Sequence, residues 1–164
     1  MTYSPHPLND FYIIYLHNPK IYTIFAADLE NTSMYSLMDK VQYWIERADY
    51  DYATAADLMK SRRWIYVAFM CHQTLEKTIK AYYTQHMPDD PPYIHNLTRL
   101  AEKSGLYELM TEEQKSFVDA VTPMNIEARY PDYKSLLAAS LNEEVCQELM
   151  ANTQSLQQWI KSKL

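Results

Sequence analysis

The chain has 164 residues, a length that suits one globular domain, and its 48% hydrophobic against 22% charged residues exclude a disordered or low-complexity protein. Its single glycine disfavours phosphate-binding loops, Rossmann folds and β-sandwiches, whose turns use several glycines. The net charge of −6 argues against a protein that coats nucleic-acid backbone with a basic face. Helices joined by short loops remain as the expected architecture.

Residues 1–35 differ in composition from the rest and are expected to form an N-terminal extension. FYIIYL (11–16) and IYTIF (21–25) are rich in β-branched and aromatic residues and flank a turn sequence, which predicts two short strands. The alternatives are a disordered extension, or upstream translation ahead of a start at Met34. The run 11–16 is shorter than the roughly 18–20 residues that cross a bilayer, and no basic segment opens the chain. We therefore expect a cytoplasmic protein that does not bind membranes.

Helical periodicity begins at residue 36. Apolar residues recur at steps of three and four from Val41 to Met59 and predict one long helix. After a basic turn, the same period continues from Trp64 to Gln85 and predicts a second helix. The prolines that follow cannot continue that helix, so a loop is expected there.

Three further helices are predicted from their end signals. A short one runs from His95 to Ser104 and stops at Gly105, as in a left-handed C-cap. The sequences at 111–114 and 140–143 are capping-box patterns that open a fourth and a last helix, and Pro123 should interrupt the fourth. In the last helix we expect four inward residues: Val145, Leu149, Leu156 and Ile160.

The sequence thus predicts an all-α fold for residues 36–164, an up-and-down bundle of four long helices and one short helix. Cys71 and Cys146 lie on apolar stripes and are expected to be reduced core thiols. No metal-ligand motif with known spacing is present, and no cofactor is expected.

A polar stripe on the second predicted helix is the main candidate for a functional site. His72, Glu76 and Lys80 are four residues apart and share one face, with Lys77 on the adjoining stripe. The simplest interpretation is a solvated face with a Glu76–Lys80 ion pair worth a few tenths of a kcal/mol. The alternative is a binding site.

Four blocks in order make the sequence similar to the HEPN domain family over about residues 38–163. They are Trp44 with Ala48 and Asp57-Leu58, then the block 72–81 (HQTLEKTIKA), then His95-Asn96-Leu97, and finally Ala128-Arg129-Tyr130-Pro131-Asp132. The resemblance implies a helical bundle that commonly forms a homodimer. It also implies a minimal nucleotidyltransferase as a partner, as in toxin–antitoxin pairs.

The resemblance bears on catalysis through one motif. Ribonucleases of the family use an R-x(4-6)-H motif, but Arg129 is followed by YPDYKSL, without a histidine. The chain is closer to the R-Y-P-D branch, for which nucleotide binding or a partner role is implied, and an enzyme is not favoured. The implied ligand-binding residues, with no catalytic or metal-binding residue among them, are His72, Glu76, Lys77, Lys80, His95, Arg129, Tyr130 and Asp132.

Three hypotheses of function follow. The favoured one is a nucleotide- or RNA-interacting module in which Lys77, Lys80 and Arg129 donate to phosphate and Tyr130 stacks on a base. In the second, a ribonuclease toxin uses a non-standard histidine, His72 or His95. In the third, the bundle serves only for protein interaction.

Overall fold

The computed structural model describes the backbone of residues 19–127 and 139–164, and the side chains of residues 36–125 and 139–164. The chain divides into two compact units, Met1–Met38 and Asp39–Leu164. In the first unit the described residues are helical. The second unit contains the bundle and every side chain discussed below.

Helix α2 (Pro19–Lys60) begins earlier than the sequence predicts. The predicted strand at residues 21–25 is wrong, because those residues are helical, and its predicted partner at 11–16 lies outside the described residues. Pro19 suits the first turn of a helix, where its missing N–H costs nothing. The helix formers from Ala26 to Glu30 then outweigh the small helix penalty of the β-branched residues. An isolated two-stranded ribbon would be marginal in water.

Helix α3 (Trp64–His86) matches its prediction and follows α2 through a tight turn. The turn closes with hydrogen bonds from the Arg63 N–H to the Leu58 carbonyl and from the Arg62 N–H to the Met59 carbonyl, both 3.0 Å. This pair of bonds is a Schellman motif, which requires a left-handed residue after the helix end. Arg62 fills that position with φ of 56°, where glycine is usual.

The middle of the bundle consists of short helices whose ends follow the predicted signals. Helix α4 (Leu97–Lys103) begins two residues later than predicted, after the N-cap Asn96, and the predicted left-handed Gly105 follows its C-cap with φ of 74°. A 3₁₀ turn, η1 (Tyr107–Leu109), leads to α5 (Glu112–Val121), where Thr111 and Gln114 form the predicted capping box. Pro123 separates α5 from α6 (Met124–Glu127), so the fourth long helix is broken as expected.

Helix α8 (Glu143–Lys161) differs from the sequence prediction in its N-cap and in one residue of its inward face. Its N-cap is Asn142, whose side chain accepts from the Val145 N–H at 2.9 Å, and not Ser140. The helix therefore starts at Glu143, and its apolar stripe passes through Cys146, which is fully buried. Val145 is 40% exposed and the prediction that it points inward is wrong, whereas three other residues are buried as predicted: Leu149, Leu156 and Ile160.

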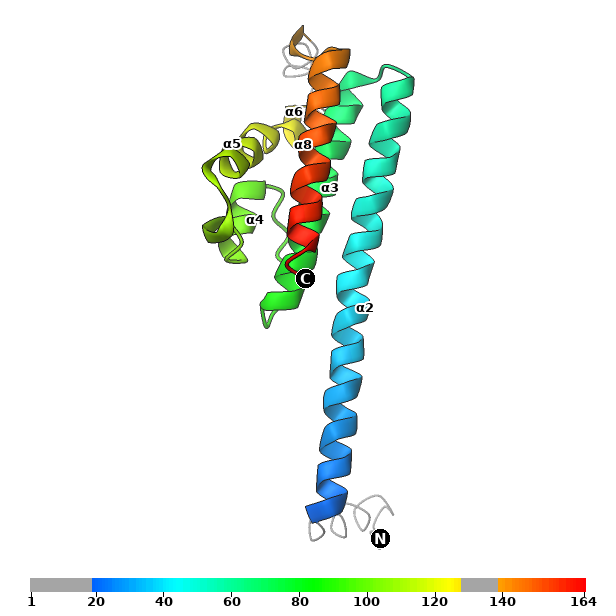
Figure 1. Ribbon diagram of the computed structural model, residues 1–164, viewed down its shortest axis with the longest axis vertical. Helices are drawn as coiled ribbons and strands as arrows, with labels where there is room; N and C mark the ends of the chain where they lie inside the picture. The colour runs from blue at the N-terminus through cyan, green and yellow to red at the C-terminus, as the bar shows by residue number, and fades with distance from the viewer. Residues whose placement is uncertain (1–18, 128–138) are drawn as a thin grey trace, which may run out of the picture. The chain divides into compact units, whose positions relative to one another are not determined.

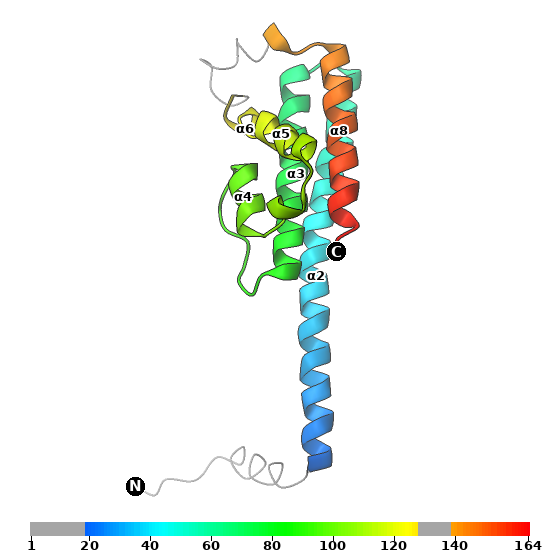
Figure 2. The ribbon, with the colours of Figure 1, turned by 60° about the vertical axis from the view of Figure 1, so that its left-hand side comes forward.

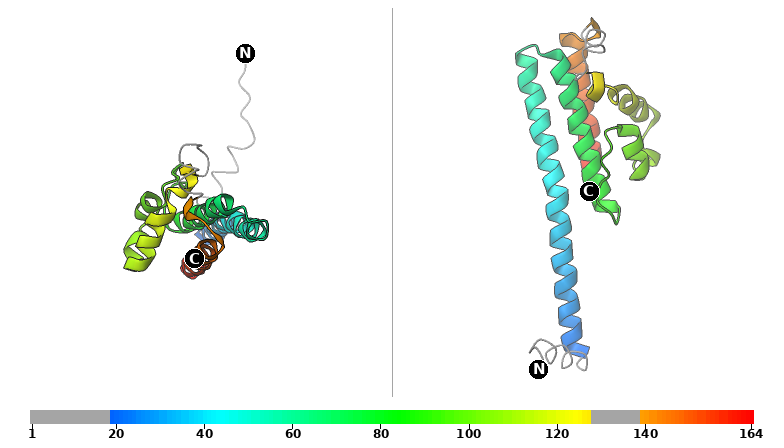
Figure 3. Two further views of the ribbon diagram at one scale, coloured as in Figure 1. Left: turned by 90° about the horizontal axis from the view of Figure 1, so that it is seen from above. Right: turned by 180° about the vertical axis from the view of Figure 1, so that it is seen from behind.

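Helix α3 is the central element of the bundle. It packs against α8 and against α4, α5 and α6, and in Figures 1 and 2 the short helices α4 and α5 lie beside it. In the second unit, residues 39–60 of α2 run antiparallel to α3, as Figure 3 shows from behind. Hydrogen bonds from Lys77 to Asp51 and from Gln157 to Asp49 join α2 to α3 and to α8. The described residues form an all-helical bundle, which confirms the predicted fold class.

The core is formed by α3 and the faces turned toward it. Its fully buried members include Leu75 and Ile79 from α3, Leu100 from α4 and Val118 from α5. Cys71 and Cys146 are both buried and free, as expected. Burial of apolar area at about 25 cal/mol per Å² makes this cluster the main source of stability.

We expect the polypeptide Met34–Leu164 to fold without residues 1–33, because every residue of the described core follows position 38. Thermal unfolding of the truncated protein should remain cooperative, with a midpoint close to that of the full chain. Circular dichroism at 222 nm provides the measurement. An insoluble or molten truncated protein would show instead that the removed residues complete the core or an interface.

Candidate functional site

The polar stripe of α3 is buried, and the interpretation as a solvated face is therefore wrong. Glu76 is 4% exposed, Lys80 7% and His72 0%. The Glu76 carboxylate accepts hydrogen bonds from Lys80 Nζ at 2.8 Å and from His95 Nδ1 at 3.0 Å. We call these residues, with His72, the Glu76 cluster. The loop between α3 and α4 brings His95 back onto α3 and completes it.

His72 holds this loop in place. Its Nε2 donates to the His95 carbonyl at 2.9 Å, because a carbonyl oxygen can only accept. Its Nδ1 lies 3.4 Å from the side-chain nitrogen of Gln73, which can donate to an unprotonated ring nitrogen. With both ring nitrogens engaged and no exposed surface, His72 positions the backbone of His95 and cannot meet a solvent-borne ligand.

The two lysines already have acidic partners. Lys80 is paired with Glu76, and its Nζ lies 5.2 Å from the centroid of the Trp44 ring, within cation–π range. Lys77 is bonded to Asp51 of α2 and also reaches Gln73 at 3.4 Å. Neither lysine is an unpaired cation. To donate to phosphate directly, as predicted, each would have to exchange its hydrogen bond to a carboxylate for one to the phosphate.

Burial and hydrogen bonding act in opposite directions on Glu76. Burial would raise its pKa, but the hydrogen bonds from Lys80 and His95 and the charges of those groups outweigh it, so the pKa is lowered. Glu76 is therefore a carboxylate at neutral pH. An ionised carboxylate is the form that can hold Lys80 and orient His95 together.

The lowered pKa predicts a contribution of Glu76 to acid stability. A group with a folded pKa below its unfolded value of 4.5 stabilises the fold above pH 4.5, and this contribution is lost as the pH falls through the folded value. The free energy of unfolding, measured in urea from pH 7 to pH 3, should therefore fall less steeply in Glu76→Gln than in wild type. Equal slopes for the two proteins would contradict this linkage.

His95 is the solvent-accessible member of the Glu76 cluster. Its side chain is 56% exposed while Nδ1 is held by the buried carboxylate. A carboxylate that accepts from one ring nitrogen places the proton on that nitrogen and fixes the orientation of the ring. This leaves Nε2 as the ring nitrogen available for hydrogen bonding with a ligand.

Three predicted site residues lie outside the described part of the chain: Arg129, Tyr130 and Asp132. Their place in a binding site stays a prediction. The structure thus brings together four of the eight predicted residues, His72, Glu76, Lys80 and His95. Lys77 lies on the neighbouring stripe of α3, bonded to Asp51 on α2.

The buried thiols are unsuited to nucleophilic chemistry. Burial raises the pKa of Cys71 to about 12 and that of Cys146 to about 11, so both are protonated thiols at neutral pH. Among the residues whose side chains are described, no group of three or more His, Cys, Asp or Glu could hold a metal ion.

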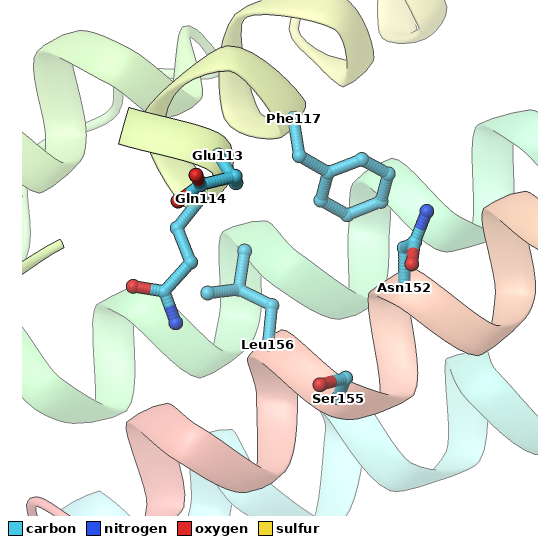
Figure 4. Close-up of a pocket in the computed structure, with 6 residues that line it drawn as sticks. All are labelled: Glu113, Gln114, Phe117, Asn152, Ser155 and Leu156. Carbon is cyan, nitrogen blue, oxygen red and sulfur yellow. The ribbon is translucent and has the colours of Figure 1, made fainter. Parts of the chain in front are cut away.

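A pocket of about 250 Å³ lies elsewhere, between α5 and α8 (Figure 4). Its lining is Glu113, Gln114, Phe117, Asn152, Ser155 and Leu156. The one charged side chain among these is a carboxylate, which repels phosphate. The pocket is therefore a poor candidate for a nucleotide site, and the Glu76 cluster remains the stronger one.

Within the described ranges, no helix is both long and apolar enough to span a membrane.

Residues 41–163 match the family model of the HEPN domain. The structure is similar to the crystal structure of TT1696 from Thermus thermophilus, with a TM-score of 0.67 and 16% sequence identity, over 76% of this chain and 98% of that one. At that identity the likeness concerns the fold. No curated protein matches the chain.

Proposed function

Because the chain belongs to the HEPN domain family, we propose that it is a nucleotide- or RNA-interacting module that acts as a homodimer and with a minimal nucleotidyltransferase partner, as in a toxin–antitoxin pair. One observation carries the ligand class: a buried, ionised Glu76 orients His95, whose side chain is 56% exposed. Buried ion pairs add little to stability on balance, because desolvation offsets their attraction. A binding role accounts better for a carboxylate that supports an exposed imidazole.

Arg129 supplies the second part of the proposal. A guanidinium next to the cluster would give phosphate a two-pronged contact that a lysine cannot reproduce. Calorimetric titration of ATP and of a short RNA into wild type, Arg129→Ala and Arg129→Lys tests this, with the exposed Arg99→Ala as the matched control. Both Arg129 variants should bind more weakly and Arg99→Ala as wild type does. Equal affinities in all four proteins would remove Arg129 from the site.

A homodimer is supported by the 15 tyrosines and 3 tryptophans of the chain, residue types that are enriched at interfaces. Tyr43 and Tyr50 are 48% and 75% exposed on α2. Sedimentation equilibrium at micromolar concentration should give about twice the chain mass of 19.4 kDa. A monomer at that concentration would exclude a site shared between two copies.

A ribonuclease is the second candidate, and the Glu76–His95 bond favours it. An imidazole oriented by a carboxylate can transfer protons near neutral pH. Of the two histidines considered, only His95 is exposed, because His72 is fully buried. Cleavage of total RNA by the purified protein, lost in His95→Ala, would place this function above binding alone. A protein that binds no nucleotide and cleaves no RNA would be a bundle for protein interaction.

A further inference from the structure

The loop between α3 and α4 carries a fully exposed aromatic residue close to His95. Tyr93 is 100% exposed, although a tyrosine ring normally buries much of its surface. The Ile94 N–H donates to the Pro92 carbonyl at 2.8 Å, a turn that has Tyr93 at its centre. Tyr93 therefore lies at the tip of a tight turn with its ring in solvent.

The segment on either side of Tyr93 is anchored. After it, Ile94 packs against the core and His95 is bound through its carbonyl to His72 and through its ring to Glu76. Before it, the Tyr83 hydroxyl donates to Asp89 at 3.0 Å and Lys40 pairs with Asp90 at 3.0 Å. The exposed ring thus stands on a short segment held at both ends.

We propose that Tyr93 and His95 form the contact surface for one nucleotide, free or within single-stranded RNA, in which Tyr93 stacks on the base and His95 Nε2 binds the phosphate. The proposal rests on the proposed function, but the direct contacts with the nucleotide come from the loop and not from Lys77 and Lys80. Both lysines are ion-paired with carboxylates, whereas the side chains of Tyr93 and His95 are exposed.

The chemistry of the two side chains matches the two ends of a nucleotide. Glu76 already accepts from Nδ1, so Nε2 is the ring nitrogen left for the phosphate, and the Nε2–H of an imidazolium is the donor that a phosphate oxygen requires. Two residues of chain span at most about 7 Å, so the Cα atoms of Tyr93 and His95 are no farther apart than that, a separation that one nucleotide can bridge. Stacking on an aromatic ring tolerates any base, so little sequence preference is expected.

The acidic residues of the loop have partners of two kinds. Asp90 is ion-paired with Lys40, whereas Asp89 accepts from the neutral Tyr83 hydroxyl and keeps its negative charge. Glu76 is 4% exposed and is balanced by Lys80.

The test compares affinities for AMP, adenosine, inorganic phosphate and a short oligouridylate, by calorimetry and by fluorescence anisotropy of the labelled RNA. Tyr93→Ala should weaken binding of AMP and RNA about tenfold, and Tyr93→Phe should leave it within about twofold, because the ring is kept. Tyr66→Ala, which truncates another tyrosine, 45% exposed at the start of α3, is the matched control and should bind as wild type does.

His95→Asn keeps an amide that can donate to Glu76 but has no equivalent of Nε2, so it tests the phosphate contact with little risk to the fold. This variant should weaken the binding of AMP and of inorganic phosphate and leave the affinity for adenosine unchanged.

The wild-type protein distinguishes the two sources of the nucleotide. If it binds AMP and not RNA, the ligand is a free nucleotide, and the reverse result assigns single-stranded RNA.

Two outcomes would overturn the proposal and are distinguishable. If wild type binds AMP or RNA, and Tyr93→Ala and His95→Asn bind equally well, the nucleotide contacts lie elsewhere and only this proposal fails. If wild type binds none of the four probes, the nucleotide- or RNA-interacting function fails together with it.

Discussion

Replacing Glu76 by alanine should destabilise the protein by about 3–5 kcal/mol, because removal of one partner leaves a buried charge without compensation. The Lys80 side chain is 9% exposed and bonds to Glu76 at 2.8 Å. Without the carboxylate its ammonium group would remain enclosed by α3 and Trp44. The His95 ring would also lose its hydrogen bond to α3. Urea unfolding at pH 7 measures the loss directly.

Two comparisons make this expectation specific. Glu148→Ala removes an exposed carboxylate from α8 and should change stability by less than about 0.5 kcal/mol. The double variant Glu76→Leu with Lys80→Leu replaces the pair by apolar groups and should recover much of the loss, since such exchanges are often neutral. A single Glu76→Ala variant as stable as wild type would mean that water reaches Lys80.

Replacing Leu75 by alanine should cost about 2–5 kcal/mol, the range for truncating a buried leucine. Leu75 is fully buried on α3, the helix that packs against α8, α4, α5 and α6. A cavity at this position therefore removes contacts to several helices at once, and the surrounding helices cannot all shift to fill it. The midpoint and slope of the urea transition report the change.

Leu109→Ala is the matched control for Leu75→Ala. Leu109 is 54% exposed in η1, so its truncation removes few contacts and should change the free energy of unfolding by less than about 0.5 kcal/mol. Similar losses for the two variants would contradict the assignment of α3 as the centre of the core.

The features predicted best from the sequence are those fixed by local chemistry. The capping box of Thr111 and Gln114 depends on residues three apart, and Gly105 ends α4 because it adopts a left-handed conformation readily. The periodicity of α3 likewise predicts its bounds and apolar residues that it buries, such as Cys71, Leu75 and Ile79. Each of these signals lies within one element of the chain.

The errors arise where two local signals compete or where distant residues decide. Residues 21–25 have β-branched side chains typical of strands, but a helix continues through them. Both Ser140 and Asn142 are suitable N-caps. Residues 139–140 are themselves helical, and Asn142 has the extended backbone of an N-cap, so α8 begins after Asn142. In α8, both Val145 and Cys146 were expected to face inward, but neighbouring residues on a helix point in different directions, and only Cys146 is buried.

The candidate site shows the same limit. The spacing of His72, Glu76 and Lys80 placed them on one face, but periodicity alone could not show that the loop after α3 would cover that face with His95. The partner of Lys77, Asp51, is 26 residues away on another helix, and nothing in the sequence pairs them. Tyr93 had one signal, its position after two prolines in a loop, and this indicates exposure and no more.

The arginine in the turn between α2 and α3 bears on the order of folding events. A left-handed conformation costs a residue with a side chain roughly 1–2 kcal/mol, so the turn at Arg62 is disfavoured until other contacts impose it. The α2–α3 hairpin should therefore not nucleate at its turn. We expect contacts along the helices, such as that of Lys77 with Asp51, to form first and the turn to close afterwards.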